Sequence, residues 1–215
     1  MCAIVGSFNR QKLLELIELN SYRGSHSYSF STLDQYGKLR IVTQALGTIK
    51  ESEIVIPSGS YGIVHIQAPT TDAKTLSSIH PAIDVWWQET VPSRCLWHNG
   101  IIKANHIARM QKEQQSTEQW DTKLLLNDLR NGFEVLNNVD GSFSCLYYSS
   151  FWLYLFRNEI SPMFIDDHMN ISSTKFVGSK PTEPNTVFYM DTVSKALRPV
   201  YKFETVENPY YFGSN

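Results

Sequence analysis

The sequence is poor in cysteine, and this shortage excludes two classes of protein. Its three cysteines, Cys2, Cys95 and Cys145, are odd in number and widely spaced. Such a set fits neither a disulfide framework nor a zinc site. Unpaired cysteines are typical of a reducing compartment, so we expect a cytoplasmic protein that holds no metal.

Clustered positive charge and long apolar segments are missing as well. No basic run exceeds two residues and the formal net charge is −2, which gives no electrostatic reason to expect nucleic acid or a membrane surface as a partner. No segment approaches the length of a membrane span, and the first residues lack the basic and apolar regions of a signal peptide. We therefore expect no nucleic-acid binding and no membrane attachment.

Hydrophobic residues, by contrast, are plentiful. They make up 42% of the 215 residues, and aromatic residues make up 13%, which is enough for one large domain with a real core. No internal repeat, low-complexity tract or linker divides the chain. We expect residues 1–215 to form a single domain.

The local patterns come in a segregated order. Strand patterns occupy 2–8, 28–33, 37–46, 61–69 and 93–100, with a helix pattern at 10–19. Two helix patterns follow at 105–114 and 121–139, and further strand patterns occupy 143–150, 151–158, 163–167, 186–191 and 198–204. Strands, central helices and then strands predict an α+β or layered sheet-and-helix domain.

Cys2 stands directly after the initiator methionine. Removal of Met1 would leave a thiol and a free α-amine on one Cα, with pKa values near ~8.5 and ~7.7–8.0 in model compounds. The two groups can then exchange a proton at neutral pH, which is the chemistry of an N-terminal nucleophile with its own base. The alternative is an ordinary buried first-strand cysteine, since free cysteine packs as a small hydrophobe.

The most informative stretch is "WHNGII", residues 97–102. Asn-Gly at the end of a strand is typical of a turn, because glycine accepts a positive φ at little cost. The functional alternative is an oxyanion hole in which the Asn99 side-chain amide and the Gly100 backbone N–H point at one place. Loss of one such donor typically lowers the rate on the order of 100- to 1000-fold.

Several segments together carry a family resemblance. Taken in chain order, they are "CAIVG", "YRGSHS", "GIVHIQAPT", "HNGII", "QWDTKLLL", "VDGSFSCLYY" and "RNEISPMF". They resemble the successive motifs of the class II glutamine amidotransferases, the cysteine branch of the N-terminal nucleophile hydrolases. The resemblance runs from Cys2 to about Phe164 and is strongest to the glutaminase domain of glucosamine-phosphate synthases. It implies a four-layer αββα sandwich that hydrolyses the side-chain amide of L-glutamine without a cofactor.

The resemblance also implies roles for individual residues. Cys2 would be the nucleophile and its α-amine the base, while Asn99 and Gly100 would stabilise the tetrahedral oxyanion. Asp121 would bind the α-ammonium group of glutamine, although an aspartate before an apolar helix is equally typical of a helix N-cap. Arg23 belongs to a loop that covers the active site in the family, and a surface arginine is its alternative interpretation.

One substrate contact departs from the family. Gln67 stands where the family has an arginine that binds the substrate carboxylate, whereas Thr70 matches the family's threonine in the same motif. A neutral amide has no charge and no guanidinium fork, so we expect glutamine affinity to be lower by about one or two orders of magnitude. The alternatives are another cation for the carboxylate, or a substrate that lacks one.

The resemblance implies a partner too. Family members usually carry a second domain that consumes the ammonia, and residues 1–215 contain no pattern for it, so we expect a separate synthetase subunit.

Two other functions stay open. One is an N-terminal nucleophile amidohydrolase acting on another γ-glutamyl or small amide substrate, and the other is a catalytically silent binding module of the same fold. The histidines show no metal spacing, and we interpret His65 and His98 as structural.

Overall fold

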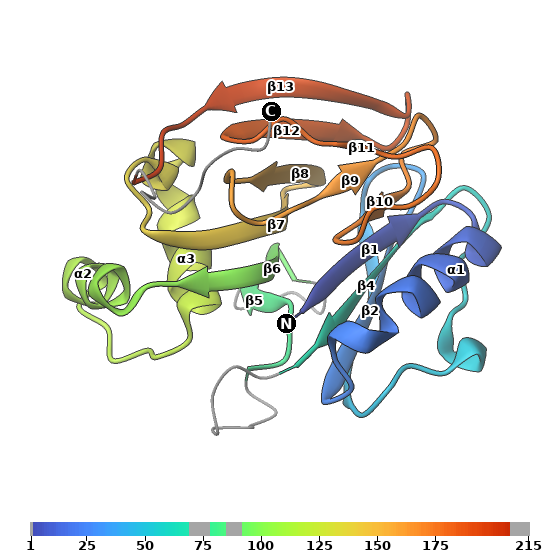
Figure 1. Ribbon diagram of the computed structural model, residues 1–215, viewed down its shortest axis with the longest axis horizontal. Coiled ribbons are helices and arrows are strands. Elements are labelled where there is room, and N and C mark those ends of the chain that lie inside the picture. The colour runs from blue at the N-terminus through green and yellow to red at the C-terminus, as the bar shows by residue number, and fades with distance from the viewer. Residues whose placement is uncertain (1, 69–77, 85–91, 207–215) are drawn as a thin grey trace.

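The strands of the computed structural model, which describes residues 2–68, 78–84 and 92–206, form two antiparallel sheets (Figure 1). In the first, seven strands lie in the order β11 (Lys180–Pro181), β9 (Phe164–Ile165), β10 (Ile171–Ser172), β1 (Ala3–Ser7), β4 (Tyr61–Gln67), β2 (Ser27–Leu33) and β3 (Leu39–Leu46). In the second, six strands lie in the order β13 (Ala196–Lys202), β12 (Thr186–Asp191), β8 (Trp152–Arg157), β7 (Gly141–Ser149), β6 (Arg94–Ile102) and β5 (Ala82–Asp84).

Helices cover the outer faces of the two sheets. Figure 1 shows α1 (Arg10–Asn20) beside the first sheet, with α2 (Ala104–Gln114) and α3 (Asp121–Asp128) at the opposite side of the molecule. Three apolar clusters fill the spaces: one between α1 and the first sheet, one between the sheets, and one between the second sheet and α2 with α3. This arrangement confirms the predicted four-layer αββα sandwich.

The position of β1 explains its composition. All five residues of β1 are buried, because α1 packs on one face of the strand and the second sheet on the other. Ala3 and Val5 contact the α1 side, whereas Ile4 faces the second sheet. The Asn9 side chain caps α1 by accepting a hydrogen bond from the Lys12 N–H. The chain thus enters the fold through a strand that is covered on both sides.

The predicted helix over 121–139 is wrong in its second half. Helix α3 ends at Asp128, and two 3₁₀ helices follow, η4 (Leu129–Asn131) and η5 (Phe133–Leu136). Gly132 separates them with a φ of 103°, which no helix accommodates. The apolar residues that suggested one long helix are nevertheless buried, because Leu129, Phe133 and Leu136 pack on the second sheet. Two further 3₁₀ helices are η1 (Ser21–Arg23) and η2 (Glu51–Glu53).

Three short strands were also not predicted. The structure adds β5, β10 and β11, of which β10 and β11 contain two residues each. Such strands carry too few residues for a periodic pattern. The remaining strand predictions, and the helices at 10–19 and 105–114, are confirmed within one or two residues.

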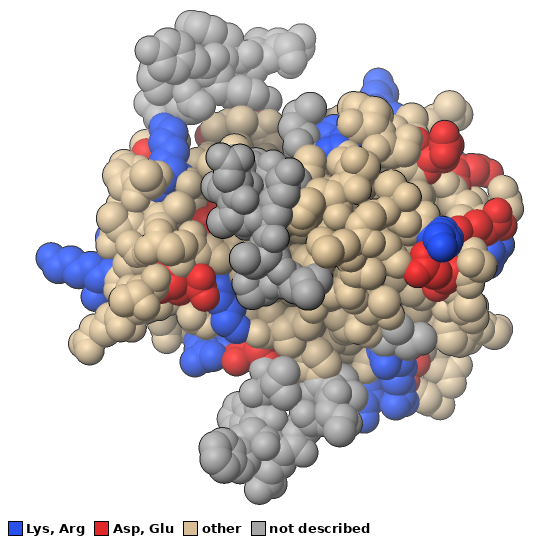
Figure 2. Space-filling view, turned by 90° about the horizontal axis from the view of Figure 1, so that it is seen from below, with Lys and Arg blue, Asp and Glu red and all other residues tan. Residues whose placement is uncertain are grey.

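The surface agrees with the balanced composition. On the face that Figure 2 shows, charged side chains of both signs lie mostly around the edge, and much of the middle is uncharged. Within the described ranges, none of the helices combines the length and apolar character that crossing a bilayer requires.

Candidate active site

Cys2 lies at the entrance to β1, where three strands of the first sheet come together. Ala3, the next residue, pairs with Ile66 near the end of β4, and Gln67 pairs with Ser27 at the start of β2. The Cys2 thiol is partly exposed and donates a weak hydrogen bond to the Ala68 carbonyl oxygen at 3.7 Å. Burial raises the pKa of this thiol, and the Ala68 contact partly offsets that effect. The sulfur therefore needs a base to become a nucleophile.

Arg23 holds the backbone of Cys2. Its Nε donates to the Cys2 carbonyl oxygen at 2.9 Å, and one terminal nitrogen reaches the Thr174 hydroxyl at 3.3 Å. The neighbouring Gly24 packs against the end of β4, where an added Cβ would lie 2.5 Å from the Gln67 carbonyl carbon. The structure thus places the loop that contains Arg23 directly beside Cys2.

The Asn99-Gly100 pair does not form a turn, which corrects the interpretation of "HNG" as the end of a strand. Strand β6 continues through both residues to Ile102, and Gly100 pairs with Phe143 of β7. Gly100 has a φ of 156°, and a Cβ at this position would overlap the Ser142 carbonyl oxygen. Glycine is required here because the two strands approach closely while the backbone of β6 is distorted.

The Asn99 side chain is tied to the first sheet. Its Nδ2 donates to the Ser173 hydroxyl at 3.3 Å, and that hydroxyl accepts a hydrogen bond from the Ile4 N–H at 3.0 Å. Ser173 also donates its own N–H to the Ile4 carbonyl oxygen. A single serine therefore connects the Asn99 amide to the strand that begins beside Cys2.

Asp121 is the first residue of α3, and Trp120 occupies the N-cap position. The N-cap interpretation of Asp121 is wrong by one residue. Its carboxylate instead accepts the Ile102 N–H at 3.1 Å and the Thr122 N–H at 2.7 Å, which joins the end of β6 to the start of α3. The Asp121 charge contributes to raising the pKa of Cys2, so the carboxylate lies within electrostatic range of the thiol.

Gln67 is buried, and its side-chain amide is already engaged. Nε2 donates to the Ser78 carbonyl oxygen at 3.0 Å, while Oε1 accepts the His80 N–H at 3.3 Å and faces the His80 Nδ1 at 3.2 Å. Thr70, which we also expect to bind substrate, lies outside the described residues.

Sequence reasoning missed a cluster of buried histidines beside these residues. The rings of His65 and His80 stack with their centroids 4.2 Å apart, and His98 lies 6.3 Å from His80. Burial lowers the pKa of His65 to about 3 and holds the pKa of His80 well below its ordinary value. The alternation of β4, which places His65 and Gln67 on one face, was the available signal.

The described residues include no group of histidine, cysteine, aspartate and glutamate side chains arranged to hold a metal ion.

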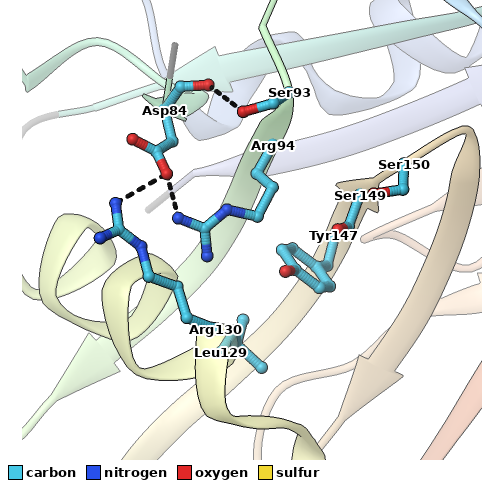
Figure 3. A pocket seen from close by; sticks show the side chains of 8 residues that line it. All are labelled: Asp84, Ser93, Arg94, Leu129, Arg130, Tyr147, Ser149 and Ser150. Atoms are coloured by element: carbon cyan, nitrogen blue, oxygen red, sulfur yellow. Dashed lines mark hydrogen bonds and ion pairs between the residues drawn. The ribbon is translucent and has the colours of Figure 1, made fainter. Parts of the chain in front are cut away.

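A separate cavity of about 540 Å³ lies at the other end of β6 (Figure 3). There the guanidinium groups of Arg94 and Arg130 both point at Asp84 and form ion pairs with it. Arg94 and Asn99 lie five residues apart on the strand, so this cavity is about 17 Å along β6 from the candidate site.

Comparison with known proteins supports the architecture. No family model and no curated protein matches the sequence. Among solved structures, the glutamine phosphoribosylpyrophosphate amidotransferase from B. subtilis, complexed with ADP and GMP, superimposes over 93% of this chain at a TM-score of 0.64 and 15% identity. A structure described as the allosteric regulatory enzyme of purine biosynthesis also superimposes over 93% at a TM-score of 0.65 and 14% identity.

The chain has the N-terminal nucleophile hydrolase fold. The matched part is 49% of the first solved chain and 48% of the second, so this chain spans about half their length. In this fold two antiparallel sheets face one another; Cys2 directly precedes β1 of the first sheet, and Asn99 belongs to β6 of the second. The fold implied by the sequence resemblance is thereby confirmed.

Proposed function

We propose that this protein is a class II glutamine amidotransferase domain that hydrolyses the side-chain amide of L-glutamine with Cys2 as the nucleophile. The observation that carries the proposal is the link from Asn99 through Ser173 to Ile4, two residues after Cys2. This link brings an amide donor of the second sheet to the strand that carries the thiol. The solved amidotransferase structures of the same fold support it.

The chemistry follows from the groups around Cys2. After removal of Met1, the α-amine takes the thiol proton, which the partly buried sulfur does not release readily by itself. The thiolate attacks the amide carbon, and the Asn99 side-chain amide with the Gly100 N–H stabilises the oxyanion. Breakage of the C–N bond releases ammonia, which takes a proton from the α-ammonium group. Water then hydrolyses the γ-glutamyl thioester to glutamate and restores the thiol.

We assign Asp121 to the α-ammonium group of the substrate. Its carboxylate is about one-fifth exposed and belongs to the first turn of α3. Two backbone N–H groups fix the orientation of this carboxylate, so a charge-assisted bond to the ammonium costs little reorganisation. Arg23 keeps Cys2 in place through the Cys2 carbonyl, and Thr70 stays a proposed substrate-binding residue.

A second candidate function is favoured by Gln67. Because its amide is bonded to Ser78 and His80, it offers the α-carboxylate of glutamine neither a charge nor a guanidinium fork. A small amide substrate without that carboxylate, or a γ-glutamyl compound held mainly by its ammonium group, fits the same nucleophile. For glutamine itself we expect a KM about 10- to 100-fold above that of a site with arginine.

The ammonia produced requires an acceptor enzyme. We propose that a synthetase domain or subunit receives it, because the matched amidotransferase chains are about twice as long as the part they share with this protein. Glutamate production that rises when a synthetase partner is added would support this arrangement. Production that is unchanged with every candidate partner would contradict it.

The decisive experiment is the intact mass of the purified protein before and after reaction with a diazo-ketone analogue of glutamine. Loss of the Met1 mass followed by one covalent adduct on Cys2 would support the glutaminase. A processed terminus that forms no adduct would favour another amide substrate. A retained methionine with no adduct would contradict both enzymatic functions and favour a silent binding module.

A further inference from the structure

The end of β4 and the start of α3 are joined by an unbroken series of buried polar contacts. The Gln67 Oε1 lies 3.2 Å from the His80 Nδ1, the His80 Nε2 lies 3.0 Å from the Thr122 hydroxyl, and that hydroxyl lies 3.0 Å from the His98 Nδ1. All four side chains are buried, and Thr122 is completely so. We call this series the Gln67–His98 chain.

Donor counting fixes the direction of the first contact. The Gln67 Nε2 donates to the Ser78 carbonyl oxygen and its Oε1 accepts the His80 N–H, so the amide cannot be flipped without placing like atoms against each other. The His80 Nδ1 therefore faces an acceptor and must carry a proton. Burial keeps the pKa of His80 well below its ordinary value, so the ring is neutral and its Nε2 is bare.

The remaining contacts follow from the first. A bare His80 Nε2 can only accept, and the Thr122 hydroxyl 3.0 Å away is its donor; the Asp121 carboxylate oxygen 3.3 Å from the same hydroxyl already accepts the Thr122 N–H. The Thr122 oxygen then has only lone pairs left for the His98 Nδ1, which donates to it at 3.0 Å, a shorter contact than the 3.5 Å between the His98 Nε2 and the Ser142 carbonyl oxygen. The protons run in one direction, from His98 through Thr122 and His80 to Gln67. Hydrogen bonds arranged in this way polarise one another and define a single geometry.

Thr122 and His98, the last two members of the Gln67–His98 chain, lie beside residues of the candidate active site. Thr122 follows Asp121 and donates its N–H to the Asp121 carboxylate at 2.7 Å. His98 precedes Asn99, and its Nδ1 lies 4.0 Å from the same carboxylate. A second contact holds β4 against β6, since the His65 Nε2 lies 3.0 Å from the His98 carbonyl oxygen.

We propose that Gln67, His80, Thr122 and His98 are positioning residues that orient Asp121 for the substrate ammonium group. This inference rests on the proposed function for the role of Asp121. Gln67 then serves the site by holding His80 in place, and not by touching the substrate carboxylate. The same position thus determines specificity, because it favours substrates that are held by their ammonium group.

The direction of the protons can be tested without any activity. A long-range ¹H–¹⁵N spectrum of the full protein distinguishes ring nitrogens that carry a proton from bare ones. We expect His80 to carry its proton on Nδ1 and to be bare at Nε2, and His98 to carry a proton on Nδ1. A neutral His80 with the proton on Nε2 would contradict this series of hydrogen bonds, because its Nδ1 would face the Gln67 oxygen without a proton.

The positioning role is tested by substitutions at Thr122. Thr122→Val keeps the shape but leaves two ring nitrogens without their partner, so we expect the KM for glutamine to rise about tenfold while kcat changes by less than about threefold. Thr122→Ser keeps the hydroxyl and should restore the KM. The matched control is Thr32→Val in β2, which removes a buried threonine hydroxyl that has no hydrogen-bond partner.

The outcomes separate this inference from the proposed function. A Thr122→Val protein with the KM of the unchanged enzyme would overturn the positioning role. A KM that rises equally in Thr122→Val and Thr122→Ser would do the same, since the hydroxyl would then be irrelevant. If the unchanged protein shows the expected histidine tautomers but does not hydrolyse glutamine, the hydrogen-bond chain is supported and the proposed function fails.

Discussion

The side-chain amide of Asn99 donates a hydrogen bond to the hydroxyl of Ser173 at 3.3 Å, and this contact joins the two sheets beside Cys2. The same hydroxyl accepts the N–H of Ile4, so the orientation of the Asn99 amide depends on the backbone of β1. A proposed oxyanion donor and the strand of the proposed nucleophile are therefore held by one serine.

Replacing this serine should harm catalysis and stability together. In Ser173→Ala, the Ile4 N–H and the Asn99 amide both lose a buried acceptor, so we expect unfolding to become easier by about 1–3 kcal/mol. We also expect kcat for glutamine to fall about tenfold because the amide is no longer held. Chemical denaturation and steady-state kinetics measure the two effects. Ser31→Ala, which removes a buried hydroxyl without a partner, should change neither by a comparable amount.

Removing the Asn99 amide tests the oxyanion hole directly. Asn99→Ala should lower kcat on the order of 100- to 1000-fold with little change in KM, because the donor acts on charge that develops during the reaction. Asn105→Ala, at an exposed position of α2, is the comparison. An Asn99→Ala protein that keeps a tenth or more of the original kcat would argue against an oxyanion role, because loss of one such donor lowers kcat on the order of 100-fold or more.

Gly100 should tolerate no side chain. In Gly100→Ala, the new methyl group would overlap the Ser142 carbonyl oxygen, so either β6 separates from β7 or the protein loses stability by about 3 kcal/mol or more. Gly178→Ala is the matched control. Gly178 has a φ of 81° but an added Cβ would meet nothing within 4 Å, so only the strain of about 1–2 kcal/mol applies. Equal losses in thermal unfolding would mean that strain, and not the close approach, limits Gly100.

Stability should fall as the solution becomes acidic. The pKa of His65 is about 3 in the folded protein, below the ordinary value of ~6.5, so the unfolded chain binds more protons between these limits. The contribution of neutral His65 to the free energy of unfolding is complete above about pH 6.5 and is lost progressively toward pH 3. The loss amounts to about 2 kcal/mol by pH 5. Urea denaturation at pH 7 and pH 5 measures this loss. The difference between the two pH values should shrink in His65→Phe, and an unchanged difference would contradict the assignment.

The Gln67 contacts lead to an expectation about substrates. If Gln67 is bonded to Ser78 and His80 during turnover as well, the α-carboxylate of glutamine contributes little to binding. Glutamine with its α-carboxylate converted to an amide should then react with a kcat/KM within about tenfold of glutamine. Blocking the α-amine should cost far more, because Asp121 would lose a charged partner. Equal losses for the two analogues would contradict this division.

Local patterns in the sequence were enough for most of the framework. The continuous apolar run of β1, the helix that starts after Asn9 and the alternating strands around 61–67 and 143–157 each bury one face or both, so their periods reveal them. The long helix over 121–139 failed because apolar spacing continues past Gly132 although the helical backbone does not. The pairing of Cys2 with Asn99, Gly100 and Asp121 came from the order of short motifs and not from periodicity.

The sequence by itself determined most of the strands and helices, because their periods depend on contacts between near neighbours in the chain, and the order of its short motifs indicated the fold family and the candidate site residues. Only the tertiary structure decided that Asn99-Gly100 lies inside a strand, since the strain at Gly100 is stabilised by pairing with Phe143 more than 40 residues away. It alone also brought Gln67, His80, Thr122 and His98 together. Those residues come from four separate segments, and their burial and hydrogen bonding exist only once the two sheets have packed.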